Sequence, residues 1–330
     1  MQMLANLGSG IVLNNQLIPN TRDGGNHPQP CDVYEPNGTI RAFIVALHGG
    51  GGTKEQFAAS LGVLLGLPVS SSKVAWNVLQ TWGVALIVPQ GSHCSPSNEG
   101  PWNPNGVNTV SAEYPNGIGA WSNRSFWSGA DDPQFTKDAA AWGAARYGSG
   151  ALRILAGHSA GGIMVNRKWY EHSLSGGYTT YVAASGPAAA YYRDNPSTPV
   201  IVKPFLGHFG ALDTNLQIDG GKFYNDTWEL SQPTKAWVQI PNYLVGELQQ
   251  LQARVTAYNA QHSLAPQTVT RAAGVTTAAA GGGTVTTWSY SGGANVVRLY
   301  SAAAHSTRDL QRCSGRRLIV DWMVFAFQNA

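Results

Sequence analysis

The sequence predicts a mostly parallel α/β sheet that is covered by helices on both faces. Short apolar runs alternate along its 330 residues with stretches of helical periodicity, which is the pattern of such a sheet. Hydrophobic residues make up 43% of the chain, so a core of useful size is available. The length would allow two domains, but α/β sheets of this size often fold as one. We therefore expect a single domain over residues 1–330.

Six apolar runs are expected to form the buried strands of this sheet. They lie at residues 43–47, 84–88, 152–156, 181–184, 204–207 and 296–300. Helices are expected at residues 138–146, 160–173, 242–261 and 318–328. The third helical pattern is the clearest, because Leu244, Leu248, Leu251 and Val255 share one face. The low-complexity segment 272–287 is expected to form a surface hairpin.

Two long connections, at residues 91–129 and 214–241, interrupt this alternation. Connections of that length are uncommon in compact domains and often serve as lids or binding loops. Both follow the carboxyl ends of strands, where open α/β sheets bind their ligands. Their aromatic residues, among them Trp127, Trp228 and Trp237, are therefore candidates for substrate contact. The alternative for each is that it packs its loop onto the body of the domain.

The composition argues against nucleic-acid and membrane partners. Charged residues make up only 12% of the chain, the formal net charge is +3, and the basic residues are scattered. No apolar run approaches the ~20 residues that a membrane-spanning helix needs. A surface with so few charges favours an exported protein.

The three cysteines, Cys31, Cys94 and Cys313, contain no CxxC pair that would suggest a zinc or thioredoxin-type site. We expect no metal and no organic cofactor. Cys94 and Cys313 both fall in loops predicted at one end of the sheet, so this pair is favoured if a disulfide forms. The alternative is three unpaired thiols.

The segment Gly157-His-Ser-Ala-Gly161 matches the GxSxG motif and lies between a predicted strand and a predicted helix. In that context the motif forms a sharp, strained turn that lifts a serine hydroxyl above the sheet, and its small flanking residues make room for the turn. The sequence therefore predicts an α/β-hydrolase fold with Ser159 as the nucleophile. The alternative is an ordinary strand–helix turn in which Ser159 only caps the helix.

A second motif, His48 followed by four glycines, comes directly after the strand at 43–47. A tetrahedral intermediate needs N–H donors that point at its developing oxyanion. We expect one donor to be the N–H of Ala160, and the other to be that of Gly50, with Gly49 and Gly51 as alternatives. His48 is expected to hydrogen-bond nearby backbone rather than to transfer protons.

The nucleophile needs a base, which in this fold follows it late in the chain. His172 and His262 fall in or at the end of predicted helices, and His208 precedes the candidate acid. His305 follows the last predicted strand across a short loop of small residues, so His305 is the predicted base.

The acid that orients the base is expected between Ser159 and His305 in the chain. Asp213 follows the predicted strand at 204–207 by a short turn, which makes it the first candidate. Asp219 is the second. The alternative for each is a solvated loop carboxylate.

Together, six segments resemble the poly(3-hydroxybutyrate) depolymerase and feruloyl or acetylxylan esterase group of α/β-hydrolases. They are Ala46-Leu-His-Gly-Gly50, Val88-Pro-Gln90, Trp127 with Asp131-Asp132, Gly157-His-Ser-Ala-Gly-Gly162, Gly210-Ala-Leu-Asp213 and His305, in the order of the family. The resemblance covers roughly residues 30–330. It implies a secreted or periplasmic enzyme, expected to be a monomer, that cleaves esters of polymers or aryl acids. It also implies Ser159, Asp213 and His305 as the catalytic triad.

The sequence departs from this group at two places that bear on the substrate. Gly50 stands where many members have a cysteine, and Ala303-Ala304-His305 replaces the common Gly-Gly-His. The neighbouring oxidised poly(vinyl alcohol) hydrolases are similar in low charge, length and export, and they cleave a β-diketone C–C bond with the same serine chemistry. Such an activity is the leading alternative. A catalytically inactive polymer-binding module and a structural or adhesion protein are more distant ones.

Overall fold

An 11-stranded mixed sheet forms the centre of the molecule in this computed structural model. The structure describes residues 3–4, 10–21, 28–49, 52–61, 78–93, 119–120, 132–171, 177–188, 202–213, 217–222, 227–230, 237–240, 243–279, 282–301 and 315–330. No helix within these ranges is long and apolar enough to cross a membrane.

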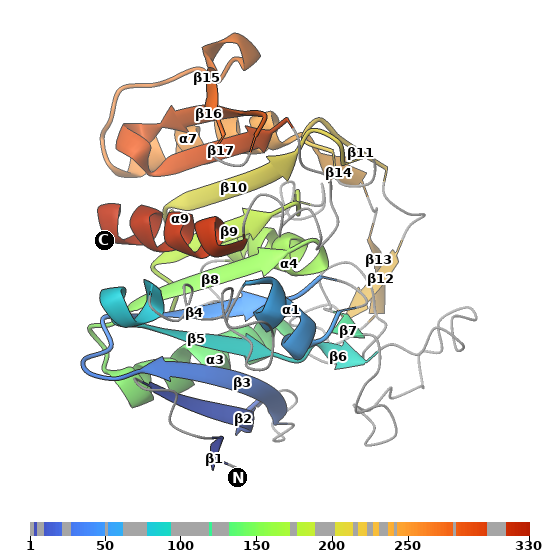
Figure 1. The fold of residues 1–330 in the computed structure, drawn as a ribbon. Helices are drawn as coiled ribbons and strands as arrows, with labels where there is room; N and C mark the ends of the chain where they lie inside the picture. The colour runs from blue at the N-terminus through green and yellow to red at the C-terminus, as the bar shows by residue number, and fades with distance from the viewer. Residues whose placement is uncertain are drawn as a thin grey trace.

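The strands of the sheet are parallel in its centre and antiparallel at both edges (Figure 1). In spatial order they are β1 (Met3–Leu4), β2 (Gly10–Ile18), β3 (Gln29–Pro36), β5 (Val84–Pro89), β4 (Ala42–Leu47), β8 (Leu152–His158), β9 (Thr180–Ala184), β10 (Phe205–Gly210), β17 (Asn295–Tyr300), β16 (Thr284–Tyr290) and β15 (Val275–Ala278). The six from β5 to β17 are parallel. All six predicted strands lie in this parallel part.

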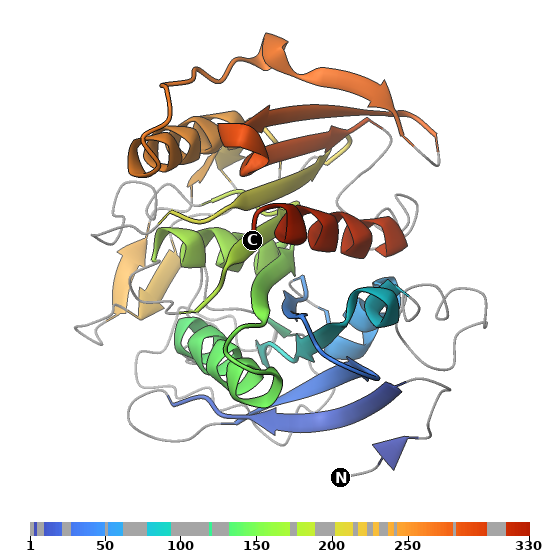
Figure 2. The ribbon, with the colours of Figure 1, turned by 90° about the vertical axis from the view of Figure 1, so that its left-hand side faces the viewer.

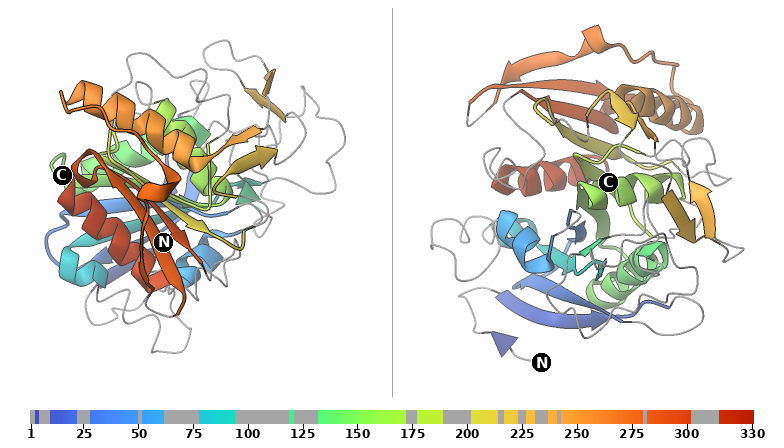
Figure 3. Two further views of the ribbon diagram at one scale, coloured as in Figure 1. Left: turned by 90° about the horizontal axis from the view of Figure 1, so that it is seen from above. Right: turned by 90° about the vertical axis from the view of Figure 1, so that its right-hand side faces the viewer.

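Helices cover both faces of the sheet, which confirms the predicted fold class. The helices α3 (Asp132–Tyr147), α4 (Ala160–Tyr170) and α7 (Glu247–Gln261) lie on one face. On the other face lie α1 (Lys54–Ser60) and α9 (Gly315–Gln328). Figure 2 shows the two layers on opposite sides of the sheet, and the view from above in Figure 3 agrees. The chain therefore has the α/β-hydrolase fold.

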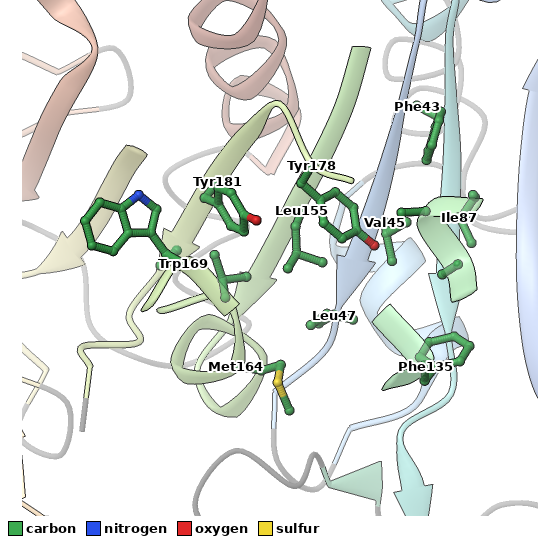
Figure 4. Close-up of a cluster of buried hydrophobic side chains, with 14 of the residues drawn as sticks. Phe43, Val45, Leu47, Ile87, Phe135, Leu155, Met164, Trp169, Tyr178 and Tyr181 are labelled. Atoms are coloured by element: carbon green, nitrogen blue, oxygen red, sulfur yellow. The ribbon is translucent and has the colours of Figure 1, made fainter. Parts of the chain in front are cut away.

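Each face of the sheet has its own hydrophobic core, because alternate side chains of a buried strand point to opposite faces. Figure 4 shows the core between the sheet and the layer of α3 and α4. Its members include Phe43, Val45, Leu47, Ile87, Phe135, Leu155, Met164, Trp169, Tyr178 and Tyr181. The intervening residues Ile44 and Ala46 of β4 pack toward α1 and α9, with Trp322 of α9 in the same cluster. The strand β8, which ends directly before Ser159, is thus held from both sides.

All four predicted helices have different boundaries in the structure. The helix predicted at 138–146 begins at Asp132 and ends at Tyr147, and the one predicted at 318–328 begins at Gly315. The helix predicted at 242–261 begins only at Glu247, because Tyr243–Val245 forms strand β14, which pairs with β11 (Gly220–Lys222). Gly246 stands between them with a non-helical backbone (φ −55°, ψ 133°). Leu244 is therefore a buried strand residue instead of a helical one. The helix predicted at 160–173 ends at Tyr170.

The long connections contribute strands to three small two-stranded sheets at the end of the molecule where the parallel strands terminate (Figure 1). They pair β6 (Ser92–His93) with β7 (Gly119–Ala120), β11 with β14, and β12 (Thr227–Leu230) with β13 (Trp237–Ile240). The segments predicted to be long loops thus contain some regular structure. The predicted hairpin at 272–287 is present as β15 and β16, and β16 joins the main sheet through β17.

Candidate catalytic site

Ser159 occupies the sharp turn between β8 and α4, at the carboxyl end of the central strand. Its backbone has φ 55° and ψ −119°, a conformation that side-chain-bearing residues rarely adopt. The turn is held by a hydrogen bond from the Ser159 N–H to the Ala184 carbonyl on β9, at 2.8 Å. The Ser159 side chain makes no capping hydrogen bond to α4. This is the geometry of a nucleophile elbow, and it leaves the helix-cap alternative without support.

The glycines around Ser159 are required by close backbone contacts. A Cβ atom on Gly157 would lie 2.4 Å from the backbone of Gly161. A Cβ atom on Gly161 would lie 2.3 Å from the carbonyl oxygen of Leu47, at the end of β4. Residues with side chains therefore cannot occupy these positions without moving the turn.

The glycine-rich loop after β4 passes directly beside Ser159. An ideal Cβ on Gly49 would lie 3.2 Å from the Cβ of Ser159 and 3.2 Å from Nδ1 of His158. Gly50 and Gly51 lie outside the described residues. The described part of the loop is therefore in the place where the sequence predicts the oxyanion donors.

Both ring nitrogens of His48 take part in hydrogen bonds with backbone groups. Nδ1 lies 2.7 Å from the Gly49 carbonyl oxygen, and a carbonyl can only accept, so Nδ1 carries the proton. Nε2 accepts the Gly91 N–H at 2.8 Å. This pattern agrees with the expectation that His48 binds backbone, and it engages the ring lone pair that a base would need.

Ala160, the other predicted donor, is the first residue of α4 and is buried. The first N–H groups of a helix point out of its N-terminus and carry partial positive charge. Since α4 begins directly after Ser159, the dipole of α4 favours negative charge beside that residue.

Asp213 is buried, with 4% of its surface exposed, in the turn that follows β10. Its N–H donates to the Gly210 carbonyl at 3.2 Å, and Ala211 of the same turn donates to the Tyr300 carbonyl at 2.9 Å. Tyr300 ends β17, the strand that precedes the predicted base in the chain. The turn that bears Asp213 is thus tied to the strand from which the segment with His305 departs.

Asp219, the second candidate for the acid, has a different environment. Its side chain is 64% exposed and forms an ion pair with Arg271 at 2.5 Å. This environment matches the alternative given for each acid candidate, a solvated loop carboxylate. The structure therefore favours Asp213 over Asp219 as the acid candidate.

Several predicted site residues cannot be placed in the geometry. His305, Gly50 and Trp127 lie outside the described residues, as do Cys94 and Cys313. Trp228 lies in β12 and Trp237 in the paired strand β13. Both strands lie at the end of the molecule where the parallel strands terminate. Cys31, in β3, is buried with a free thiol. Within the described ranges, no group of three or more His, Cys, Asp or Glu side chains is arranged to hold a metal ion.

His208 is a buried histidine of β10 that lies in the same cross-sheet row as His158 and Ala184. Burial, reinforced by the nearby Arg298, holds the pKa of His208 well below its usual value. Its ring stacks on Tyr300, with 5.9 Å between the ring centroids. Within the described part of the chain, neither of its ring nitrogens has a hydrogen-bond partner. His208 is therefore a neutral core histidine in this structure.

Sequence reasoning missed a buried polar group at the far end of the glycine loop. Lys54, the first residue of α1, is buried and forms an ion pair with Asp32 of β3 at 2.9 Å. Asp32 also accepts the Asn15 N–H at 3.0 Å. Neither residue stands in a recognisable motif, so only the tertiary structure reveals that they anchor this loop.

Neither a protein-family model nor a curated protein sequence matches this chain. Solved structures match the chain at low identity and with TM-scores below 0.5. An S-formylglutathione hydrolase from Agrobacterium tumefaciens is 11% identical with a TM-score of 0.48, over 100% of this chain and 99% of that one. An esterase from Pyrobaculum calidifontis is 13% identical with a TM-score of 0.45, over 97% of this chain and 86% of that one. A putative dienelactone hydrolase from Klebsiella pneumoniae is 14% identical with a TM-score of 0.42, over 95% and 98%.

Proposed function

We propose that this protein is a serine hydrolase that cleaves carboxylic esters through an acyl-enzyme formed on Ser159. The observation that carries the proposal is the strained backbone of Ser159 between β8 and α4, with the glycine loop beside it. Strain of this kind persists only where the surrounding structure imposes it, and it is concentrated at functional sites. Here the imposing contacts are those of Gly157 and Gly161.

In the proposed reaction the Ser159 hydroxyl attacks the ester carbonyl while His305 accepts its proton. The oxyanion that forms is stabilised by the N–H groups of Ala160 and Gly50. His305 then protonates the departing alcohol, and an acyl group remains on Ser159. A water molecule, deprotonated by His305, attacks this acyl group and releases the acid, which restores the hydroxyl of Ser159.

Asp213 has the role of orienting His305 and stabilising its protonated form. A carboxylate buried as deeply as Asp213 is costly unless it is compensated by hydrogen bonds or positive charge. An imidazolium supplies both. The hydrogen bond between Ala211 and Tyr300 supports this role, since it links the turn of Asp213 to the end of β17.

As substrate we propose an ester of a polymer or of an aryl acid, cleaved outside the cytoplasm in a secreted or periplasmic location. The resemblance of the motifs to polyester depolymerases and feruloyl esterases supports this class. The low content of charged residues supports export. The strands that contain Trp228 and Trp237 lie at the end of the sheet where the parallel strands terminate and Ser159 is found. This placement supports contact with an extended substrate.

The test is hydrolysis of p-nitrophenyl acetate and butyrate by the wild type and Ser159→Ala, with the active fraction titrated by a fluorophosphonate. We expect Ser159→Ala to lower kcat by ~10⁴-fold or more and to abolish labelling. Ser263→Ala is the matched control, because Ser263 also has a positive φ (54°) but lies exposed beyond α7. A wild type that is inactive and unlabelled would refute the proposal and favour a polymer-binding module.

The substrate class is tested next with feruloyl esters, poly(3-hydroxybutyrate) and β-diketones. Ester cleavage releases an alcohol, whereas β-diketone cleavage releases an enolate from the same acyl-enzyme chemistry. Preference for the polymer or the aryl ester by kcat/KM supports the proposed class. Preference for the β-diketone overturns it while leaving the serine mechanism intact.

A further inference from the structure

The glycine loop beside Ser159 is bounded by two residues whose positions are fixed by hydrogen bonds. His48 precedes the glycines, and Lys54 follows them after Thr53. Between them, Gly52 donates its N–H to the Gly49 carbonyl at 3.1 Å.

A single side chain, that of Gln90, contacts both ends. Gln90 directly follows β5 and is buried, with 6% of its surface exposed. Its Oε1 accepts the Lys54 N–H at 3.0 Å, while its Nε2 lies 3.4 Å from Nε2 of His48. Its own N–H donates to the Pro30 carbonyl at 2.9 Å, which fixes Gln90 to β3.

The next residue, Gly91, reinforces this contact with the ring of His48. Its N–H donates to Nε2 of His48 at 2.8 Å, and its carbonyl accepts from Nε2 of Gln90 at 3.4 Å. Since Nε2 of His48 accepts these donors, its Nδ1–H is directed at the Gly49 carbonyl. The end of β5 therefore sets both the position and the tautomer of His48.

The orientation of the Gly49 carbonyl has a consequence for the oxyanion hole. A trans peptide is planar, so its C=O and the N–H of the following residue point in opposite directions. Fixing the carbonyl of Gly49 thus fixes the peptide with which the glycine loop begins, beside Ser159. The second N–H donor that the sequence predicts for the oxyanion belongs to this loop. Such donors stabilise a transition state only when they are aimed in advance at the developing charge.

We propose that Gln90 is a positioning residue of the oxyanion hole, whose amide bridges His48 and Lys54 and thereby holds the glycine loop against Ser159. This inference rests on the proposed serine-hydrolase function. Gln90 touches neither the nucleophile nor the substrate in this scheme. It acts through the loop, and its loss should weaken the binding of the transition state more than the binding of the substrate.

The test compares Gln90→Met with Gln80→Met. Gln80 is the control, because both groups of its amide also form hydrogen bonds, Oε1 accepting the Asn37 N–H at 3.0 Å and Nε2 donating to the Asn37 carbonyl at 2.9 Å. It lies before β5, at the opposite end of that strand from Gln90. Methionine has a similar length and removes both hydrogen-bonding groups in each variant.

For p-nitrophenyl acetate we expect Gln90→Met to lower kcat by about 10- to 100-fold, with KM changed less than about twofold. Gln80→Met should keep the wild-type kcat. Titration with a fluorophosphonate and the unfolding midpoint show whether each variant is folded with an intact nucleophile. If Gln90 had only a structural role, Gln90→Met would lower the unfolding midpoint and the titratable fraction without lowering kcat per titrated site.

Gln90→Glu supplies a second test, including the case in which Gln90→Met does not fold. It keeps an oxygen acceptor for the Lys54 N–H but removes the amide donor to His48, so we expect a kcat between those of the wild type and Gln90→Met. If kcat per titrated site in the Gln90 variants equals that of Gln80→Met, the inference is overturned and the serine mechanism stands. A wild type that neither hydrolyses the ester nor is labelled overturns both.

Discussion

A Cβ atom on Gly161 would lie 2.3 Å from the carbonyl oxygen of Leu47, which means that the start of α4 packs directly on the end of β4. The carbonyl of His48 lies at 2.7 Å from the same position. The turn that contains Ser159 and the start of the glycine loop are therefore in backbone contact. Any side chain placed between them would separate Ser159 from the loop that is proposed to stabilise the oxyanion.

Gly161→Ala is accordingly expected to impair both folding and activity. Overpacking of a buried contact typically costs about 1–3 kcal/mol, and a displacement of about 1 Å at the site can lower the rate about 100-fold. Urea unfolding and ester hydrolysis measure the two effects. Gly150→Ala is the control, because no atom lies within 4 Å of a Cβ at that position. Equal stability and activity of the two variants would contradict the proposed contact.

The assignment of the acid is tested by comparing Asp213→Asn with Asp219→Asn. The buried Asp213 is expected to hold His305 in its productive tautomer, and its replacement by an amide should lower kcat by about 10⁴-fold. Asp219 is exposed and paired with Arg271, so its replacement should change kcat less than about twofold. Steady-state hydrolysis of p-nitrophenyl butyrate measures both. A larger loss of kcat in Asp219→Asn than in Asp213→Asn would assign the role of the acid to Asp219.

The parallel centre of the sheet was predictable from sequence, whereas the antiparallel edge formed by β1, β2 and β3 was not. Strands buried on both faces form continuous apolar runs, as in 84–88 of β5. By contrast, β3 is nearly as buried but contains Asp32, Glu35 and Pro30, so it lacks an apolar run. The charge of Asp32 is tolerated there because it pairs with Lys54, a contact that spans 22 residues of sequence.

Within the candidate site, the residues that stand in local motifs could be identified from the sequence. Ser159 was identifiable because its turn requires glycines close by in the chain. The role of Gln90 was not, since its contacts with His48 and Lys54 span 42 and 36 residues. Gln90 stands in one of the segments that carry the family resemblance, but the sequence assigns it no contacts until the fold brings its partners to it.

A buried ion pair couples α7 to α4, the helix that follows Ser159. Glu247 and Arg254 of α7 are both fully buried and lie 2.5 Å apart. Arg254 also donates to Asn166 of α4 and lies over the Phe205 ring, 3.5 Å from its centroid. Burial raises the pKa of Glu247, and the charge of Arg254 opposes this shift.

Arg254→Met is therefore expected to destabilise the protein by about 3–5 kcal/mol, because it leaves Glu247 buried without its counter-charge. The double variant Glu247→Leu with Arg254→Met should recover much of this loss, since it removes both charges. Arg271→Met is the control, because the pair of Arg271 with Asp219 is exposed and should contribute less than about 1 kcal/mol. Chemical denaturation provides the comparison, and equal effects of Arg254→Met and Arg271→Met would show that burial does not matter here.

The cysteines provide a prediction that thiol titration can check. Cys31 is fully buried, and burial, with the nearby Asp32 charge, raises its thiol pKa well above the usual value. We expect Cys31 to resist thiol reagents in the native protein, because the reactive thiolate is not formed. If Cys94 and Cys313 form the favoured disulfide, unreduced protein titrated in denaturant gives one thiol and reduced protein gives three. Three thiols without reduction would exclude the disulfide.

His208 is predicted to make the protein less stable in mild acid. Burial, reinforced by Arg298, holds its pKa in the folded state well below the usual value, whereas in the unfolded chain it titrates near about 6.5. Below that pH the unfolded state binds a proton that the folded state does not. The contribution of His208 to the unfolding free energy therefore falls with decreasing pH, by at most about 1.4 kcal/mol per pH unit, until the folded-state pKa is reached.

The variant His208→Phe isolates this effect. Phenylalanine keeps a ring to stack on Tyr300 and has no proton to bind, and it removes two ring nitrogens for which the described residues offer no partner. Urea unfolding of wild type and variant should give parallel pH profiles above about pH 7 and diverge below about 6.5, with the wild type less stable. His262→Phe is the control, because His262 stacks on Tyr258 in a similar way but is exposed. Profiles for His208→Phe and wild type that stay parallel down to pH 5 would show that His208 is protonated in the folded protein.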